Sequence, residues 1–408
     1  MRRLSLLPLC VLLLLATTLR ADSPRNVGPW DIPTLQQVPQ AEWGPDDNGI
    51  KEVRYAGEPY QGKPTKVFAY YGKPAGDGPF PGMVLVHGGG GKAFRKWVEH
   101  WQARGYAAIA MDLAGNGPNG RLADGGPDQS NLIKFREFTP EQTKDMWSYH
   151  AGAAVLRAHS LLAAQPGVDK DRIGVTGISW GGYLTCIVAG IDARLKVAVP
   201  VYGCGFLGDN SAWVEGSLNK LAKEQCPLAQ TLRPSQYLPS VTCPILFING
   251  TNDFAYPLDS YQKSYFCVTK APVTLTIIPR LPHGHIWTFP EVDTFIDSHL
   301  KGGKPLFNIG MSLCIAGDKV WAQPVTGPAV KSLASIKKVE LHYTTDTGPW
   351  QKREWKVLPG KIEPLNNVKD AFQFEGELPH KRPIVYYLSV TDDRGLVTST
   401  KHQEATAP

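Results

Sequence analysis

The chain has 408 residues, of which 42% are hydrophobic and 20% charged, and its 43 basic and 37 acidic residues leave a net charge of +6. This length suits two to three domains, and the apolar fraction excludes wholesale disorder. The 41 glycines cluster instead of recurring at every third position, and there is no long run of Lys and Arg, so neither a collagen-like protein nor a nucleic-acid-binding protein is predicted.

The first residues have the pattern of an export signal. Arg2 and Arg3 precede the apolar run Leu4–Ala16, which is short for a helix that spans a bilayer. We expect cleavage near Ala21, with an uncleaved anchor as the alternative. The sequence therefore predicts a signal peptide over residues 1–21 and a secreted or periplasmic protein that has no stable membrane insertion after cleavage.

Cysteine usage agrees with an oxidising compartment and does not indicate a metal site. Removing the signal discards Cys10 and leaves an even number of cysteines, so disulfides are allowed, although some of them can be buried thiols. Six cysteines permit fifteen pairings, which the sequence leaves open. No Cys-x-x-Cys or other close metal spacing is present, so no metal or cofactor is predicted. The mature cysteines are Cys186, Cys204, Cys226, Cys243, Cys267 and Cys314.

After the signal, a Pro-rich segment without clear periodicity predicts an N-terminal arm over residues 22–50. Apolar runs and helical stretches then alternate over residues 51–302, a pattern typical of a parallel sheet covered on both faces. One helix is expected from Thr139 to Ala164 and another from Glu291 to Leu300. The expected strands are Lys66–Tyr71, Met83–Val86, Ala107–Met111, Arg172–Thr176, Leu195–Val199, Pro244–Ile248 and Val273–Ile278.

The pattern changes at the linker Lys301–Pro305. Beyond it, segments of alternating polarity such as Lys338–Tyr343, Ala371–Phe374 and Ile384–Val390 are separated by turn residues and show no helical periodicity. Such strands predict a small antiparallel β-sandwich, immunoglobulin-like or fibronectin-like, over residues 303–408.

The motif that decides the chemistry is Gly177-Ile178-Ser179-Trp180-Gly181, directly after an expected strand and before an apolar helical run. A serine at such a tight strand-to-helix turn is exposed as a nucleophile, and small neighbours prevent clashes there. The following helix directs its N-terminal dipole at the site and favours developing negative charge. We therefore predict that Ser179 is a catalytic nucleophile.

A serine nucleophile needs a base, and the base needs an acid that orients it. Asp253 follows the expected strand Pro244–Ile248 at its carboxyl end, which is where the acid belongs. Asn252 and Asp259 are rivals nearby, but Asn carries no charge and Asp259 falls within the next expected helix. Asp253 is the predicted acid.

The base follows the last strand, in Pro279-Arg280-Leu281-Pro282-His283-Gly284-His285. His283 is favoured because it lies nearer to the strand and precedes a glycine, and His285 remains the alternative. A metal pair formed by the two histidines lacks a third ligand at suitable spacing, so a metal centre is not predicted.

The run His87-Gly88-Gly89-Gly90-Gly91 after another strand is suited to an oxyanion hole, because backbone amides without a Cβ approach an oxyanion closely. We assign the donors to Gly89 and to Trp180, the residue after the nucleophile, with Gly88 or Gly90 as alternatives to Gly89. The run lacks the glycine spacing and the Lys-Ser/Thr ending of a phosphate-binding loop.

Four of these segments together resemble the α/β-hydrolase fold, most closely its dienelactone hydrolase, acetyl xylan esterase and prolyl-oligopeptidase-like branches. The resemblance extends from Tyr55 to Leu300 and implies serine-dependent acyl transfer to water. It departs from these branches in three ways: fewer than a hundred residues precede His87, where a prolyl oligopeptidase normally has a propeller, the simplest dienelactone hydrolases have Cys where this chain has Ser179, and the C-terminal module is unusual. The matching segments are Val84–Gly91, Gly174–Gly182, Phe247–Asp253 and Pro279–Gly284.

The sequence thus predicts a secreted serine hydrolase that cleaves carboxylic esters, such as acetyl or other acyl esters on carbohydrate, with a small-molecule or carbohydrate ester as its partner. The alternatives are a serine oligopeptidase or aminopeptidase and a non-catalytic polysaccharide- or surface-binding protein. Two insertions, Leu113–Phe138 and Tyr202–Ser240, are expected to determine specificity. Trp350 and Trp355 are expected to pack the sandwich rather than to form a carbohydrate platform. The oligomeric state stays open.

Overall fold

The computed structural model describes residues 25–221, 232–307, 309, 313–322, 336–364 and 372–406. The predicted signal peptide, Cys10 and Cys226 lie outside these residues.

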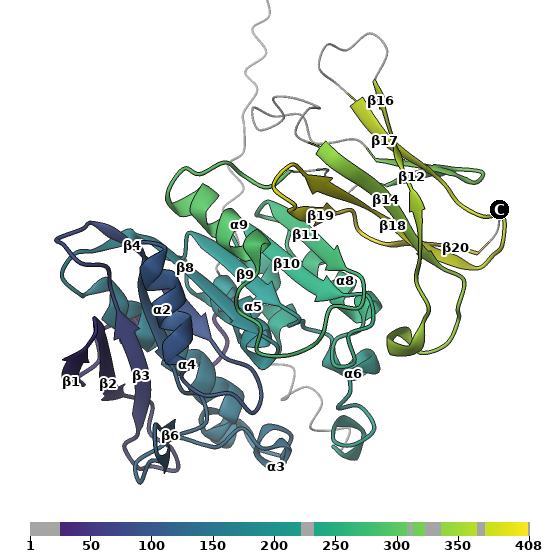
Figure 1. Cartoon of the computed structure of the whole chain (residues 1–408). Helices are drawn as coiled ribbons and strands as arrows, with labels where there is room; N and C mark the ends of the chain where they lie inside the picture. Colours follow the sequence, from purple (N-terminus) through teal and green to yellow (C-terminus); the bar gives the residue numbers. More distant parts are fainter. Residues whose placement is uncertain are drawn as a thin grey trace, which may run out of the picture.

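A nine-stranded sheet forms the centre of the molecule (Figure 1). From β5 to β11 all neighbouring strands run parallel, whereas β1, β2 and β3 form an antiparallel extension that pairs with β5. Strands that are buried at every position, such as β5 and β9, explain the continuous apolar runs of the sequence. In sheet order the strands are β1 (Ala41–Asp47), β2 (Ile50–Ala56), β3 (Lys66–Gly72), β5 (Ala107–Met111), β4 (Phe80–Val86), β8 (Val168–Ile178), β9 (Val197–Val201), β10 (Ile245–Gly250) and β11 (Val273–Ile278).

The segment expected as an N-terminal arm is in part a piece of this sheet. Its second half forms β1, which pairs antiparallel with β2, and its first half packs on α4, where the Trp30 indole donates to the Tyr149 carbonyl at 3.0 Å. β1 contains a Gly and a Pro, which interrupt the alternation that predicts a strand. An edge strand tolerates both residues because one side of it needs no ladder partner.

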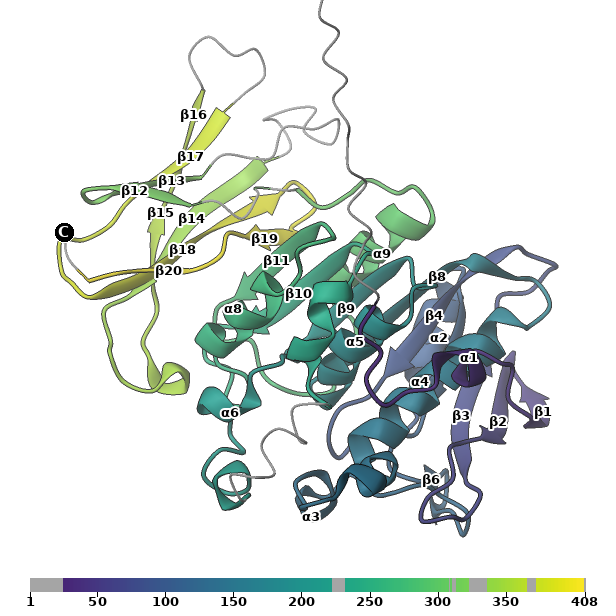
Figure 2. The ribbon, with the colours of Figure 1, turned by 180° about the vertical axis from the view of Figure 1, so that it is seen from behind.

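Helices cover both faces of the sheet. Figure 1 shows α2 and α9 in front of it, and Figure 2 shows α4 and α5 on the opposite face. The helix expected from Thr139 begins as the 3₁₀ turn η1, because Met146 adopts an extended conformation and interrupts the chain before α4. The helices are α1 (Ile32–Leu35), α2 (Arg95–Ala103), α3 (Asn131–Lys134), α4 (Trp147–Ala163), α5 (Trp180–Ile191), α6 (Leu207–Asn210), α8 (Leu258–Phe266) and α9 (Pro290–Leu300).

Short elements complete the connections. They are the hairpin β6 (Asn116–Gly117) and β7 (Gly120–Arg121) and the 3₁₀ turns η1 (Pro140–Asp145), η2 (Leu218–Lys220), η3 (Pro234–Gln236), η4 (Leu238–Ser240) and η6 (Trp350–Lys352).

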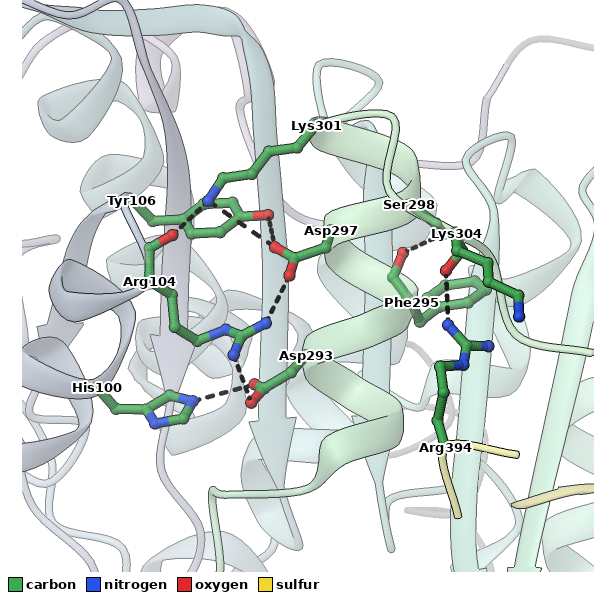
Figure 3. A network of polar contacts seen from close by, with 10 residues as sticks. All are labelled: His100, Arg104, Tyr106, Asp293, Phe295, Asp297, Ser298, Lys301, Lys304 and Arg394. Carbon is green, nitrogen blue, oxygen red and sulfur yellow. Dashed lines mark hydrogen bonds and ion pairs between the residues drawn. The ribbon is translucent and has the colours of Figure 1, made fainter. Parts of the chain in front are cut away.

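A polar network fixes α9 against the α2–β5 connection (Figure 3). Asp297 accepts from Arg104 at 2.5 Å and from the Tyr106 hydroxyl at 2.6 Å. Asp293 lies 3.0 Å from His100 Nε2. Because α9 directly follows the loop with the two candidate histidines, this network holds the far end of that loop.

Two antiparallel sheets beyond α9 form the C-terminal module, defined here as residues 313–322, 336–364 and 372–406. Their facing side chains share one core, to which Val320 and Phe374 contribute from one sheet and Leu341 and Leu388 from the other. The predicted α/β fold with a C-terminal β-sandwich is confirmed. The first sheet has the order β12 (Cys314–Ala316), β13 (Lys319–Ala322), β17 (Phe372–Glu377), β16 (Lys361–Pro364); the second has β15 (Lys356–Pro359), β14 (Ile336–Thr344), β18 (Ile384–Asp392), β19 (Val397–Ser399), with β20 (Gln403–Ala405) beside β18.

The module lies against the β11 edge of the central sheet (Figures 1 and 2). There the Ile277 amide donates to Ser399 Oγ at 3.0 Å, and the Thr276 hydroxyl donates to the Val397 carbonyl at 2.8 Å. Trp350 and Trp355 are buried in a small apolar cluster that also holds Leu258 and Ile277 of the domain built on the central sheet, together with Val385 and Tyr387. They therefore pack between the two parts of the chain, and neither forms an exposed platform.

Three further observations concern the cysteines, membrane-spanning helices and metal-binding groups of the described residues. The five described cysteines are all free thiols. In the part of the chain that the structure describes, no helix has the length and apolar character needed to span a membrane. Within the same residues, no group of three or more His, Cys, Asp or Glu side chains is placed to hold a metal ion.

Candidate active site

The backbone of Ser179 is held in a strained conformation between β8 and α5. Its φ of 59° and ψ of −119° lie in a region that residues other than glycine rarely adopt. The neighbouring glycines are required by space: a Cβ on Gly181 would lie 1.9 Å from the Val86 carbonyl oxygen, and one on Gly177 would lie 2.3 Å from the Gly181 oxygen. The turn therefore brings the start of α5 directly against the end of β4.

The structure brings Ser179, His283 and Asp253 into one hydrogen-bonded chain. Ser179 Oγ lies 2.8 Å from His283 Nε2, and His283 Nδ1 lies 2.6 Å from Asp253 Oδ2. The other carboxylate oxygen of Asp253 accepts from the amides of Ala255 at 2.9 Å and Tyr256 at 2.7 Å. With the Nδ1 proton directed at the carboxylate, Nε2 is left to accept the serine proton.

Parallel strands explain how residues so far apart in the sequence meet. Ser179, Asp253 and His283 follow β8, β10 and β11, whose carboxyl ends lie at the same edge of the sheet. β10 and β11 are in register from Ile245 opposite Val273 to Gly250 opposite Ile278. The two loops thus leave the sheet side by side.

Two aromatic rings flank the His283 imidazole, and the sequence analysis did not identify either as part of the site. The Tyr202 ring is stacked on it at a centroid distance of 4.6 Å, and its hydroxyl donates to the Pro282 carbonyl at 3.1 Å. Phe254 lies 4.9 Å away on a half-exposed surface. Tyr202 directly follows β9 at the same sheet edge, and that position was the signal in the sequence that could have identified it.

His285 lies outside this chain. Its ring packs 5.1 Å from Phe94, and a Cβ on Gly91 would lie 2.6 Å from its Nε2. Burial lowers the pKa of His285, and its Nε2 is buried without a hydrogen-bond partner among the described residues. The two histidines that the sequence left as alternatives therefore have different surroundings, and only His283 contacts both Ser179 and Asp253 in the described structure.

The glycine run curls over the end of β4 beside the serine. The Gly91 amide donates to the Gly88 carbonyl at 3.1 Å, a Cβ on Gly88 would lie 2.9 Å from Ser179 Cβ, and one on Gly89 would lie 2.9 Å from Trp180 Cδ1. The Trp180 amide belongs to the first turn of α5, where the helix offers it no acceptor. The two predicted oxyanion donors thus belong to segments that pack against each other beside Ser179.

His87 anchors this run as a neutral side chain. Its Nε2 accepts from the Leu113 amide at 2.9 Å, so Nδ1 carries the proton and donates to the Gly88 carbonyl at 2.7 Å. Burial lowers the pKa of His87 to about 4. The imidazole therefore connects the glycine run to the start of the insertion 113–138.

A small, partly open pocket is lined by Trp180, the residue after Ser179, and by segments of both insertions. The Lys134 ammonium lies 4.2 Å from the centre of the Trp180 ring, and burial lowers its pKa to about 8. Trp213 packs on Trp180 at 4.7 Å. The described lining includes Lys134, Arg136 and Arg233 and contains no acidic side chain.

The two rivals of Asp253 have other partners. Asp259 accepts from Asn210 through both carboxylate oxygens, at 2.6 and 2.8 Å. Asn252 donates to main-chain carbonyls of the C-terminal module.

Comparison with known proteins places these features in a family context. The family model "Dienelactone hydrolase family" matches residues 67–288, more than half of the chain. The acetyl esterase Axe7A of Xylanibacter ruminicola is 24% identical over 255 residues, which are 56% of this chain and 54% of that protein. The uncharacterized peptidase YuxL of Bacillus subtilis is 22% identical over 321 residues, 70% of this chain and 45% of that protein. The chain thus spans about half the length of these two relatives.

Among solved structures, the acetyl xylan esterase from Paenibacillus sp. R4 superposes with a TM-score of 0.55 at 20% identity. The match covers 66% of this chain and 92% of that chain. At this level of sequence identity the structural similarity supports the shared fold and no more.

Proposed function

The chain belongs to the dienelactone hydrolase family, and from that premise we propose that it is an exported serine hydrolase that cleaves carboxylic esters through an acyl-enzyme. The observation that carries the proposal is the hydrogen-bonded chain from Ser179 Oγ through His283 to Asp253, beside a strained backbone and a glycine run. This combination supports nucleophilic catalysis because Asp253 orients the His283 imidazole, and the imidazole can accept the proton of Ser179.

In the proposed reaction His283 Nε2 takes the Ser179 proton as Oγ attacks the ester carbonyl carbon. Asp253 stabilises the resulting imidazolium, and the amides of Gly89 and Trp180 stabilise the oxyanion. Collapse of the tetrahedral intermediate transfers the proton to the leaving alcohol oxygen and leaves an acyl-Ser179. Water, deprotonated by His283, then releases the carboxylic acid and restores the serine.

We propose an acyl ester, including acetyl groups on carbohydrate, as the substrate class. The acetyl esterase among the relatives supports this choice. The half-exposed Phe254, whose ring lies 4.9 Å from that of His283, offers apolar area beside the serine on which a sugar ring or a small acyl alcohol can rest. Export follows from the pattern of residues 1–21, which lie outside the described residues.

A fluorophosphonate probe tests the proposal on the purified mature chain. We expect the wild type to be labelled, Ser179→Ala and His283→Ala to lose the labelling, and His285→Ala to retain it. Acetylated xylan oligosaccharides, p-nitrophenyl acetate and peptide anilides then separate esterase from peptidase activity. An unlabelled, folded wild type would overturn the nucleophile assignment, and loss of labelling in His285→Ala with retention in His283→Ala would reassign the base.

A further inference from the structure

Asn252, the residue directly before the proposed acid, is held by the C-terminal module. Its side-chain amide nitrogen lies 2.7 Å from the carbonyl oxygen of Arg353, 3.3 Å from that of Gln351 and 3.5 Å from that of Trp350. These carbonyls belong to η6 and the residue after it, about a hundred positions away in the sequence. The loop that carries Asp253 is therefore attached to a separate part of the fold.

The chemistry of this contact requires a donor at position 252. The Trp350 carbonyl accepts from the Arg353 amide at 3.2 Å, whereas the later carbonyls of a helical turn have no amide donor within the turn and need an external one. The Asn252 amide nitrogen supplies two N–H groups, and its oxygen accepts from the Thr251 hydroxyl at 2.7 Å. An aspartate at position 252 has the same shape but would place a carboxylate oxygen against the carbonyl oxygens of the module.

The turn that receives Asn252 is itself braced. The Arg353 guanidinium lies 3.8 Å from the centre of the Trp350 ring and donates to the Gly348 carbonyl at 2.9 Å. Trp350 is buried against Leu258 and Ile277 of the hydrolase domain. The carbonyls that face Asn252 are therefore attached to a packed element and are not part of a free loop.

The same contact reaches the histidine loop through one further residue. The Thr251 hydroxyl oxygen, which donates its proton to Asn252, accepts from the Arg280 amide at 2.9 Å. Arg280 lies three residues before His283. One chain of hydrogen bonds thus connects the module turn to both loops that carry the proposed acid and base.

We propose that Asn252 is a positioning residue through which the C-terminal module holds Asp253 and His283 at reacting distance. This inference rests on the proposed function, because it assigns to the module a role in the same active site. The module then contributes to the geometry of the active site. A module that served only to bind a surface or polysaccharide would make no contact on which the position of Asp253 depends.

The experiment compares full-length variants at this contact with a matched variant elsewhere on the same interface. Asn252→Ala removes the donor, Asn252→Asp reverses its polarity, and Arg353→Met loosens the module turn without changing the hydrolase domain. Thr276→Val, the control, removes the interface hydrogen bond to Val397 and keeps the side-chain shape. The readouts are kcat and KM for p-nitrophenyl acetate, the rate of fluorophosphonate labelling, and Tm.

We expect kcat and the labelling rate of both Asn252 variants to fall by about tenfold with KM within about twofold, since small displacements of reacting groups are costly. Arg353→Met should lower kcat by about threefold on the same grounds. Thr276→Val should lower Tm and keep kcat. Wild-type kcat in the Asn252 variants, or in Arg353→Met, would overturn the positioning role while ester hydrolysis stands. A wild type that is neither labelled nor active on esters would overturn both proposals.

Discussion

Two loops at the same edge of the central sheet are held in opposite ways. The nucleophile loop, residues 177–182, is fixed from within the hydrolase domain, because its glycines leave no space between α5 and the end of β4. The acid loop, residues 251–256, is fixed partly from outside, by main-chain carbonyls of the C-terminal module that accept from Asn252. The first depends on close backbone packing within one domain, and the second on hydrogen bonds from another domain.

Because the two loops are held by different contacts, substitutions in them should have different consequences. A change in the nucleophile loop meets backbone atoms that cannot move aside. A change in the acid loop can leave the hydrolase domain folded and still alter the distance between Asp253 and His283. Changes in the nucleophile loop should therefore lower both activity and stability, whereas changes in the acid loop should lower activity more than stability.

The largest effect on activity is expected from Gly181→Ala. The added Cβ would lie 1.9 Å from the Val86 carbonyl oxygen, so α5 must move away from β4 and carry Ser179 with it. We expect kcat/KM to fall by at least about a hundredfold and the free energy of unfolding by about 3 kcal/mol or more. Gly216→Ala is the control, because a Cβ there meets nothing within 4 Å. A wild-type kcat/KM in Gly181→Ala would contradict the steric account of this loop.

Acid should destabilise both parts of the chain together. Burial lowers the pKa of His87, His150, His342 and His402 from 6.5 to about 4, and two of them lie in each part. The unfolded chain binds more protons than the folded one between these values, so stability is lost as the pH falls from 6.5 to about 4, by roughly 2–3 kcal/mol for each histidine. Tm measured across this range should fall steeply. In His402→Gln the decrease of Tm with falling pH should be shallower than in the wild type. An equal slope in the two proteins would contradict a contribution of His402 to the acid destabilisation.

Trp350→Ala tests whether the module is joined to the hydrolase domain by a true core. Trp350 is 7% exposed and packs on Leu258 and Ile277. Its removal should lower the free energy of unfolding by about 3–5 kcal/mol, measured by urea denaturation. Trp43→Ala, at a side chain that is 38% exposed, should change it by less than about 1 kcal/mol. A loss in Trp350→Ala no larger than that of Trp43→Ala would indicate two independently held parts.

The smallest effect concerns Lys134, which lies over Trp180 beside the nucleophile loop. Because burial lowers its pKa to about 8, the charged form opposes folding below that pH, and this cost fades as the pH rises from about 8 to the ordinary value of 10.5. Lys134→Met should therefore raise stability at pH 7 by about 1–2 kcal/mol, a gain that shrinks by pH 10. Thermal unfolding at both pH values checks this, with the exposed Lys356→Met as the control. A gain independent of pH would contradict the electrostatic origin.

The sequence by itself determined the local parts of this protein. Continuous apolar runs predicted the parallel strands because both faces of such a sheet are buried. The motif around Ser179 predicted the strained turn because the residue types that such a turn requires lie within five consecutive positions, whereas the packing of Gly181 against Val86 appears only in the tertiary structure. The order of Ser179, Asp253 and the histidine loop followed from the same connectivity, and their catalytic roles stay predictions.

Tertiary structure alone decided what depends on distances between separate segments. It placed His283 rather than His285 between Ser179 and Asp253, although the two residues are chemically alike and two positions apart. It stacked Tyr202 on the imidazole and made β1 a strand, because edge position relieves the demands that its Gly and Pro would otherwise violate. Asn252 donates to carbonyl oxygens about a hundred residues later in the sequence. A hydrogen bond to the backbone of another domain cannot be predicted from the residues around Asn252.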